Sequence, residues 1–343
     1  MDQSGWHEEK TLVYYIPYQE PITNKIAGFD FVNTLIWPDN GDYTVRGDQH
    51  WIWRSDSIPD FIQEIIADDW TVVIFSNYVK TGIDQLKTRF EETGLDVFFF
   101  ASLVNDKYHK PNTGMWDLFK SIWEKISGKK LLPTDNSFYI GDRAGDISNP
   151  DPMFRKGSVE VSPDEYKDLG IPVGTPLGED SLFAARIGLT FLTPDQLPLQ
   201  LEPQFANQQE LIIMVGQQGS GKTTWAIKIA EEYDYDIVAA EPIPYQQAFV
   251  AKDKTKRLKL IGQLLGDGRS VIADATHPSK SSRADLIALA KRLKIGVRIF
   301  WVARPGRLYN QERAKPVSDI ALRSYTKNFE RPSDQEAPTI RIA

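Results

Sequence analysis

The 343-residue chain contains no cysteine. Disulfides, thiolate nucleophiles and cysteine-ligated zinc or iron–sulfur centres are therefore excluded. The sequence also lacks any run of eighteen apolar residues, and its N-terminus has no basic stretch followed by an apolar segment. We expect a protein that is neither secreted nor embedded in a membrane, and that resides inside the cell, in the nucleus or the cytoplasm.

Charge is unevenly distributed along the chain. The formal net charge is −7, yet residues 206–343 hold 22 Lys and Arg against 15 Asp and Glu, whereas residues 1–205 hold 18 against 32. The C-terminal part is therefore basic, which favours a polyanionic partner there. Two solvated surfaces of different composition would give the same numbers. The length predicts two domains, since one domain typically has roughly 100 to 200 residues.

Apolar, strand-like runs alternate with amphipathic helical segments in both parts of the chain. The first part contains KIAGFDFV, TVVIFSN, DVFFFASL and NSFYIGD, and the second contains LIIMVG, DIVAA, SVIADAT and VRIFWVA. This alternation predicts two α/β domains, each with a mainly parallel sheet. The proline- and amide-rich residues 193–210 predict a linker. We therefore expect one domain over residues 1–200 and a second over residues 201–343.

The segment GQQGSGKT, residues 216–223, lies between an apolar strand and a helical segment and matches the phosphate-binding pattern G-x-x-x-x-G-K-[ST]. Its glycines allow backbone N–H groups to surround a phosphate at a helix N-terminus, where the helix dipole favours anions. We expect Lys222 to reach the β- and γ-phosphates of ATP and the Thr223 hydroxyl to bind Mg²⁺. The expected ATP-binding residues are Gly216, Gly219, Ser220, Gly221, Lys222, Thr223 and Thr224.

Polar residues follow two later strands of the same domain. Asp274 ends SVIADAT, where a Walker-B-like or structural acid belongs, and Thr276 and Arg283 follow it closely. Arg313 lies in a basic loop after VRIFWVA. That position suits a lid arginine that stabilises the transferring charge. The alternative for Arg313 is a surface arginine that makes only a solvated ion pair.

The runs GQQGSGKTTW, IADATHPSKSSRADLIALAKRL and PVSDIALRSYTKNFERP resemble the 5′-kinase domain of polynucleotide kinase 3′-phosphatase. The resemblance covers most of the second domain. It implies transfer of the ATP γ-phosphate to a nucleic-acid 5′-hydroxyl, with Thr276 and Arg283 in contact with the nucleic acid. In that family an Asp soon after the second strand is the general base. Here the segment departs from the pattern and leaves Glu241 and Asp253 open, although a place directly after DIVAA slightly favours Glu241.

Polar groups at four strand ends of the first domain resemble those of phosphatases of the haloacid dehalogenase superfamily. Asp30 takes the place of the nucleophile, Ser76 and Lys110 follow at later strand ends, and Asp142 and Asp146 lie in GDRAGD. The resemblance to polynucleotide kinase 3′-phosphatase extends to this half through GFD, VIFSN, KPNTGMWD, IGDRAGD and EDSLFAARIGLTFLTP. It implies a 3′-phosphatase domain with a haloacid dehalogenase-like fold.

Val32 departs from the motif of this superfamily. The acid normally found two residues after the nucleophile protonates the leaving group and activates the hydrolytic water, and valine can do neither. General acid–base catalysis contributes about 10² to 10⁴ in rate, so we expect weak or absent phosphatase activity. The Val32 carbonyl can still bind Mg²⁺ together with Asp30 and Asp142 or Asp146. The alternative is that His109 or a water chain supplies the proton.

The first domain has no insertion long enough to form a lid between Ser76 and Lys110. An open site favours the end of a polymer over a small metabolite. Arg54 and the nearby Trp37, Trp51 and Trp53 could clamp unpaired nucleotides, with simple packing as the alternative.

Taken together, the patterns predict a polynucleotide 5′-kinase joined to an impaired 3′-phosphatase, which uses ATP and Mg²⁺ to repair nucleic-acid ends. A fully active bifunctional enzyme, a kinase whose first domain only binds 3′ ends, and a small-molecule kinase are the alternatives. The sequence does not distinguish DNA from RNA, because it contains no readable base-contact code. We expect a monomer without a preceding forkhead-associated domain.

Overall fold

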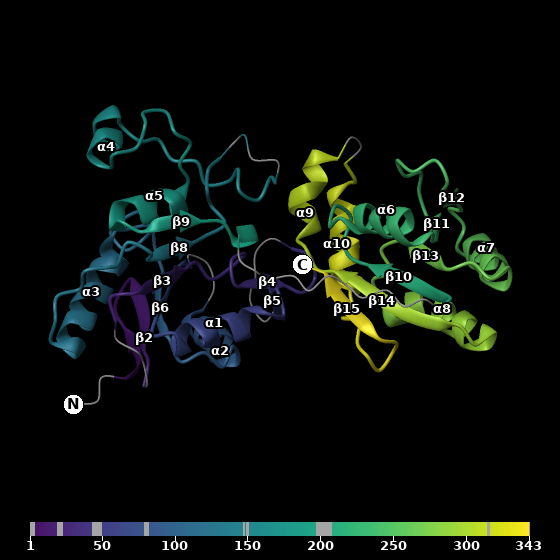
Figure 1. The fold of residues 1–343 in the computed structure, drawn as a ribbon, viewed down its shortest axis with the longest axis horizontal. Helices are drawn as coiled ribbons and strands as arrows, with labels where there is room; N and C mark the ends of the chain where they lie inside the picture. Colours follow the sequence, from purple (N-terminus) through teal and green to yellow (C-terminus); the bar gives the residue numbers. More distant parts are fainter. Residues whose placement is uncertain are drawn as a thin grey trace. The chain divides into compact units, whose positions relative to one another are not determined.

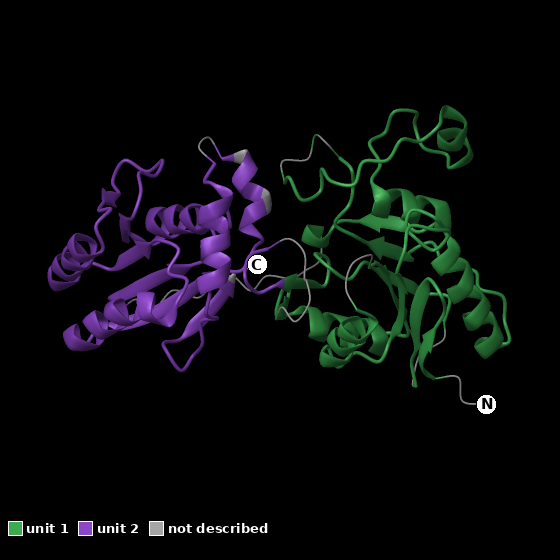
Figure 2. Cartoon of the chain, turned by 180° about the vertical axis from the view of Figure 1, so that it is seen from behind, with its two compact units in different colours: residues 1–37, 44–199 green, residues 38–43, 200–343 purple. Residues whose placement is uncertain are grey.

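The computed structural model describes residues 4–18, 23–42, 50–78, 82–146, 148, 151–196, 208–313 and 316–342. The chain divides into two compact units, coloured separately in Figure 2. Unit 1 comprises residues 1–37 and 44–199, and unit 2 comprises residues 38–43 and 200–343. Most of the predicted linker, residues 197–207, lies outside the described ranges. Within those ranges, no helix has the length and apolarity needed to cross a membrane.

Unit 1 is built on a seven-stranded sheet with the order β1-β2-β7-β6-β3-β8-β9 (Figure 1). The strands from β7 to β9 are parallel, and β1 and β2 add an antiparallel pair at one edge. The strands are β1 (Gly5–Glu8), β2 (Leu12–Ile16), β3 (Ile26–Phe29), β6 (Thr71–Asn77), β7 (Phe98–Ser102), β8 (Phe138–Ile140) and β9 (Thr190–Leu192). A separate pair, β4 (Ile36–Pro38) and β5 (Trp51–Trp53), follows the first parallel strand.

Helices cover both faces of this sheet, because its central strands are apolar on both sides. Along β6, Val72 and Ile74 point into the core formed with α1 and α2, whereas Val73 and Phe75 point into the core formed with α3 and α5. The helices are α1 (Ile58–Ala67), α2 (Ile83–Glu92), α3 (Gly114–Ser127), α4 (Pro163–Asp168) and α5 (Glu179–Ile187), with a short 3₁₀ turn at Pro194–Gln196.

Unit 2 contains a six-stranded sheet with the order β12-β11-β13-β10-β14-β15. All of its strand pairs are parallel. The strands are β10 (Glu210–Val215), β11 (Asp236–Ala239), β12 (Phe249–Val250), β13 (Val271–Asp274), β14 (Gly296–Val302) and β15 (Thr339–Ile342). Since parallel strands end at a common edge, the segments that follow β10, β11 and β13 gather there.

The helices of unit 2 cover both faces of its sheet. In Figure 1, α6 (Lys222–Tyr233) lies above the sheet and α8 (Lys280–Leu293) below it, and α7 (Lys254–Gly266) contacts α8. Beyond β14 follow α9 (Gly306–Tyr309), a 3₁₀ turn (Asn310–Glu312) and α10 (Asp319–Asn328). Both units therefore confirm the prediction of two α/β domains with mainly parallel sheets.

A buried ion pair joins α8 to the segment that precedes the last strand. The Arg283 side chain is fully buried and donates two hydrogen bonds to the Glu336 carboxylate, at 2.8 and 2.9 Å. It also donates to the carbonyl oxygens of His277, Pro278 and Glu330. The guanidinium thus holds the loop after β13 and the segment before β15 together, at the edge where β13 ends.

Removing one partner of this pair should destabilise unit 2. Glu336→Gln leaves the buried Arg283 charge without its carboxylate, so we expect the free energy of unfolding to fall by about 3 kcal/mol. Hydrogen exchange of the β13 and α8 amides reports the stability of this unit by itself.

Glu330→Gln is the matched control for this prediction. It removes an exposed carboxylate from the same segment but keeps the backbone carbonyl that Arg283 uses. We expect its effect to stay below about 1 kcal/mol. Equal exchange rates in the two variants would contradict the stabilising role of the Arg283–Glu336 pair.

Candidate functional site

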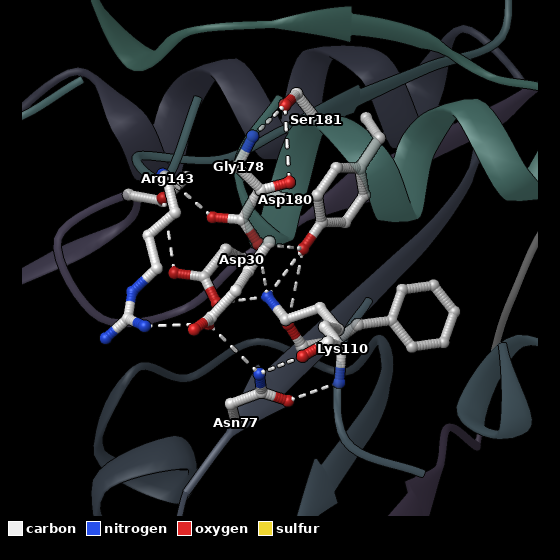
Figure 3. Close-up of polar contacts among 11 residues, drawn as sticks. Asp30, Asn77, Lys110, Arg143, Gly178, Asp180 and Ser181 are labelled. Atoms are coloured by element: carbon white, nitrogen blue, oxygen red, sulfur yellow. Dashed lines mark hydrogen bonds and ion pairs between the residues drawn. The ribbon is translucent and has the colours of Figure 1, made fainter. Parts of the chain in front are cut away.

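Lys110 lies at the centre of a buried polar cluster in unit 1 (Figure 3). Its Nζ donates hydrogen bonds to Asp30 Oδ1 and Asp180 Oδ1, both at 2.7 Å, and to the Tyr139 hydroxyl at 2.8 Å. An ammonium group has three N–H donors, so each one has a partner. The geometry fixes the ammonium between the two carboxylates.

Burial and the neighbouring charges shift the pKa of Asp30 in opposite directions, and the same holds for the pKa of Lys110. Burial raises the pKa of Asp30 to about 6, although Lys110 acts to lower it. Burial alone would lower the pKa of Lys110, but Asp180 and Asp30 together raise it above the ordinary lysine value. Lys110 is therefore a permanent cation, and it favours the ionised form of Asp30 that a nucleophile requires.

Asn77 positions Lys110 from the end of β6. Its Oδ1 accepts from the Lys110 N–H at 2.8 Å, and its Nδ2 donates to the Lys110 carbonyl at 3.0 Å. The neighbouring Ser76 is buried at the same strand end. Asp30 follows β3, and its N–H donates to the Ile140 carbonyl of β8 at 2.8 Å. Two neighbouring parallel strands, β3 and β6, thus present Asp30, Ser76 and Asn77 at one edge.

Asp180 enters the cluster through a close approach between two backbone segments. Gly145 has a φ of +71°, and a Cβ there would lie 2.4 Å from the Gly178 nitrogen, so only glycine fits. The Ser181 hydroxyl accepts from the Gly178 N–H and donates to the Ala144 carbonyl, both at 2.8 Å. These contacts attach the start of α5 to the GDRAGD loop and bring Asp180 beside Asp142.

Three carboxylates of unit 1 form a donor set suited to Mg²⁺. Asp30, Asp142 and Asp180 each offer one oxygen, and these oxygens lie within 4.8 Å of one another. Carboxylate oxygens are the ligands that Mg²⁺ prefers in proteins. Asp146 lies outside this group, and its Oδ1 instead accepts from the Ser148 N–H and hydroxyl. The structure thus favours Asp142 over Asp146 and adds Asp180.

Arg54 holds the loop that follows Asp30. Its Nη1 donates to the Asn33 carbonyl at 2.7 Å, and its guanidinium lies over the Trp37 ring at 4.8 Å and near the Phe154 ring at 5.9 Å. The side chain of Val32 packs against the core. Since Arg54 is 8% exposed and makes these contacts within unit 1, the structure favours simple packing over a clamp on nucleotides.

The phosphate-binding loop of unit 2 has the backbone that its glycines predict. Gly219 and Gly221 have φ values of +89° and +99°, and a Cβ at Gly219 would lie 2.3 Å from the Gly306 carbonyl oxygen. The loop leads directly into α6, whose first N–H groups have no acceptor within the helix. The Ser220 hydroxyl is buried and has no hydrogen-bond partner among the described residues. A buried polar atom of this kind fits a loop that awaits an anion.

Lys222 is buried without a carboxylate partner in direct contact. Its Nζ donates to the Gln217 carbonyl at 2.8 Å, the one hydrogen bond it makes within the described ranges. Burial lowers its pKa to about 8, and Asp274 only partly opposes this effect. A polyphosphate would supply the missing negative charge, so the loop fits ATP.

The acids and the arginine expected near this loop lie around Lys222. The Thr223 hydroxyl donates to Asp274 Oδ2 at 2.8 Å, so the predicted Mg²⁺ ligand and the strand-end acid lie in direct contact. Arg313 Nη2 lies 4.0 Å from Glu241 Oε2. The Glu241 charge raises the pKa of Lys222 and of Asp274, and the Arg313 charge lowers both. Burial raises the pKa of Asp274. Groups from four separate segments therefore converge on one site.

Asp253 and two other predicted residues have different surroundings. The Asp253 carboxylate caps α7 by accepting from the Lys256 N–H at 2.8 Å. The Thr276 carbonyl accepts from the Gly216 N–H at 3.2 Å, which connects the β13 loop to the phosphate-binding loop. Arg283 is fully buried in its pair with Glu336, so the prediction that it contacts nucleic acid is wrong.

Sequence reasoning missed Asp180, Asn77 and Tyr139. Asp180 has a weak local signal, an acid in the first turn of a helix after a glycine. Asn77 and Tyr139 belong to strand-like runs whose side chains read as ordinary core or strand-end residues. Their contacts with Lys110 span 33 and 29 residues of sequence, so only the fold reveals them.

Comparisons with known proteins agree with this arrangement. The polynucleotide kinase 3 phosphatase family matches residues 25–197, about half of the chain, and an AAA domain family matches residues 211–332. The bifunctional polynucleotide phosphatase/kinase of Schizosaccharomyces pombe is 26% identical, over 92% of this chain and 78% of its own length.

Two further relatives resemble all or part of the chain. A putative bifunctional polynucleotide phosphatase/kinase of Acanthamoeba polyphaga mimivirus is 26% identical over 91% of this chain and 82% of its own length. The polynucleotide 3′-phosphatase ZDP of Arabidopsis thaliana is 27% identical over 42% of this chain and 24% of its own length. The resemblance seen in the motifs is confirmed, and the chain belongs to the polynucleotide kinase 3 phosphatase family.

Proposed function

We propose that this protein is an ATP-dependent polynucleotide 5′-hydroxyl kinase joined to a 3′-phosphatase unit of low activity, and that it repairs nucleic-acid ends. One observation carries the kinase assignment: Lys222 is buried in a glycine-lined loop and, among the described residues, its ammonium contacts no carboxylate directly, although the Thr223–Asp274 pair lies nearby. The names of the full-length relatives support both the reaction and the polynucleotide substrate.

The residues around the loop divide the work of phosphoryl transfer. Lys222 and the α6 N-terminus bind the β- and γ-phosphates of ATP, and Arg313 stabilises the charge of the phosphoryl group in flight. Glu241 accepts the proton of the 5′-hydroxyl as its oxygen attacks phosphorus. When bound at Thr223 and Asp274, or at the carboxylates of unit 1, Mg²⁺ would neutralise phosphate charge.

Glu241 suits the role of general base better than Asp253 does. The Glu241 side chain is 68% exposed, so an incoming strand end can reach it. Its charge raises the pKa of both Lys222 and Asp274. The Asp253 carboxylate is engaged as a helix cap.

Replacing each acid by its amide distinguishes the two candidates. We expect Glu241→Gln to lower kcat for 5′ phosphorylation by about 10² to 10⁴, because the amide cannot accept the proton. Asp253→Asn should change kcat by less than about threefold, since Asn caps a helix as well as Asp does. Transfer of labelled phosphate from ATP to a 5′-hydroxyl oligonucleotide measures both. A larger loss in Asp253→Asn would reverse the assignment.

The site in unit 1 is assembled for phosphate hydrolysis but lacks an acid–base group at position 32. Asp30 is placed to attack phosphorus, and the buried Lys110 ammonium holds it and balances its charge. Val32 contributes a backbone carbonyl and an apolar side chain packed against the core. Proton transfer to the departing sugar oxygen therefore has no donor at the usual position.

Restoring the carboxylate should restore turnover. We expect Val32→Asp to raise the rate of phosphate release from a 3′-phosphorylated oligonucleotide by about 10² to 10⁴. Val32→Asn should leave this rate unchanged, because asparagine has nearly the shape of aspartate but cannot donate or accept the proton. The double variant Val32→Asp, Asp30→Asn should be inactive.

His109 is the alternative proton donor, and a second pair of variants tests it. If Val32 leaves the site without a donor, His109→Asn changes the residual activity of the natural chain little. Two results together would show that His109 is the proton donor and would contradict our account of position 32. The natural chain would hydrolyse the 3′-phosphate fast, and His109→Asn would abolish this activity. The double variant Val32→Asp, His109→Asn would keep it. Tight 3′-phosphate binding that persists in Asp30→Asn would favour a purely binding role for unit 1.

A further inference from the structure

Unit 2 has a cavity of about 170 Å³ whose described lining includes no residue of the phosphate-binding loop. Helices α7 and α8 and the loop after β13 enclose it. Its lining includes Lys254, Arg257, Leu258, Thr276, Pro278 and Leu286. Of these residues, only Thr276 was expected to contact nucleic acid, and the kinase mechanism uses none.

The cavity lies at the same edge of the sheet as the reacting groups. Thr276 lines it two residues after Asp274, and the Thr276 carbonyl accepts from the first N–H of the phosphate-binding loop at 3.2 Å. α7 starts there too, because the Ala251 N–H bonds to the carbonyl of Ala239 at the end of β11. Helix α6, which carries Lys222, packs on the opposite face of the sheet. If ATP binds on the face of the sheet that α6 covers, the face covered by α7 and α8 stays free for the strand whose 5′-hydroxyl accepts the phosphoryl group.

The size and lining of the cavity fit one nucleobase. A cavity of about 150 Å³ accommodates benzene, so the volume here suits a single aromatic ring better than a fused pair. Leu258, Pro278 and Leu286 form apolar walls for the faces of a ring. Arg257 and Thr276 place polar atoms at its border, where the edge of a base carries its donors and acceptors.

The start of helix α7, which contributes Lys254 and Arg257 to the lining of the cavity, is basic. The first six residues of α7 hold four cations and no acid, at Lys254, Lys256, Arg257 and Lys259. Lys254 pairs with Asp285 of α8 at 2.7 Å, but both side chains are more than half exposed, so this pair contributes little and a phosphate can replace it. The phosphate that follows the first nucleotide of a strand would meet this surface.

The wall of the cavity is rigid. His277 has a φ of +38°, and its Nδ1 lies 2.8 Å from the Met214 carbonyl oxygen. The Arg283 guanidinium holds the carbonyls of His277 and Pro278. The cavity is therefore formed before any strand binds, which lowers the entropic cost of ordering it.

We propose that this cavity holds the terminal base of the acceptor strand, on the nucleotide whose 5′-hydroxyl receives the phosphoryl group, and that it favours a pyrimidine over a purine. The inference rests on the proposed kinase function and adds a site that selects the first nucleotide. Selection comes from the volume and apolar walls of the cavity and from the polar groups of Arg257 and Thr276 in its lining. The cations of α7 outside the lining, such as Lys259, bind the backbone of any sequence.

Steady-state phosphorylation of single-stranded oligonucleotides that differ only in their first nucleotide tests the site. For the natural chain, we expect kcat/KM to be about tenfold higher with a 5′ pyrimidine than with an abasic first nucleotide, and a purine to fall between them. Leu258→Trp fills the cavity, so it should raise KM for the pyrimidine strand about tenfold while KM for ATP and the rate on the abasic strand stay unchanged.

Charge variants on the same helix provide a second test that does not depend on a bulky substitution. Arg257→Ala should reduce the pyrimidine preference, whereas Lys259→Ala, which removes one charge from α7 outside the cavity, should raise KM for all strands equally and keep the preference.

Two results would overturn the inference while leaving the kinase function standing: equal kcat/KM for abasic and pyrimidine strands, or a preference unchanged in both Leu258→Trp and Arg257→Ala. Failure of the natural chain to phosphorylate any 5′-hydroxyl strand would instead contradict the proposed function itself.

Discussion

The charge balance around two buried lysines explains most of the chemistry of this protein. Lys110 lies between two carboxylates that raise its pKa, so its charge is balanced by groups of the chain itself. Among the described residues, Lys222 has one hydrogen-bond acceptor, the Gln217 carbonyl, and burial lowers its pKa to about 8. A buried ammonium without an anion is costly unless a ligand supplies one. The first lysine therefore fixes the carboxylate of Asp30, which we propose as the nucleophile, and the second fits a polyphosphate.

Both sites depend on the common edge at which parallel strands end. In unit 1 this edge brings Asp30 of β3 and Asn77 of β6 together, and a close glycine contact adds Asp180 from α5. In unit 2 it brings Asp274 of β13 to Thr223 of α6. A parallel sheet needs helices on both faces, so the edge is the one open place where loops from several strands can share a substrate.

The sequence predicted the parts of each site whose signals are local. The phosphate-binding loop, Asp30, Lys110 and Asp142 each occur in a short motif next to a strand, and the structure brings them into clusters of the expected kind. The burial of Arg54 and Arg283 could not be predicted from local motifs. An arginine in a polar segment suggests exposure, but partners far along the chain, Glu336 for Arg283 and Phe154 for Arg54, bury these two. Long-range packing, absent from any window of sequence, decides such cases.

The central claim is that the Lys222 ammonium binds the phosphates of ATP for transfer to a strand end. The most direct test compares Lys222→Met with Lys228→Met, which alters an exposed lysine of the same helix. We predict that Lys222→Met lowers transfer of the ATP γ-phosphate to a 5′-hydroxyl oligonucleotide at least about 10²-fold, whereas Lys228→Met leaves it near the natural rate. Undiminished transfer by a folded Lys222→Met variant would contradict the account.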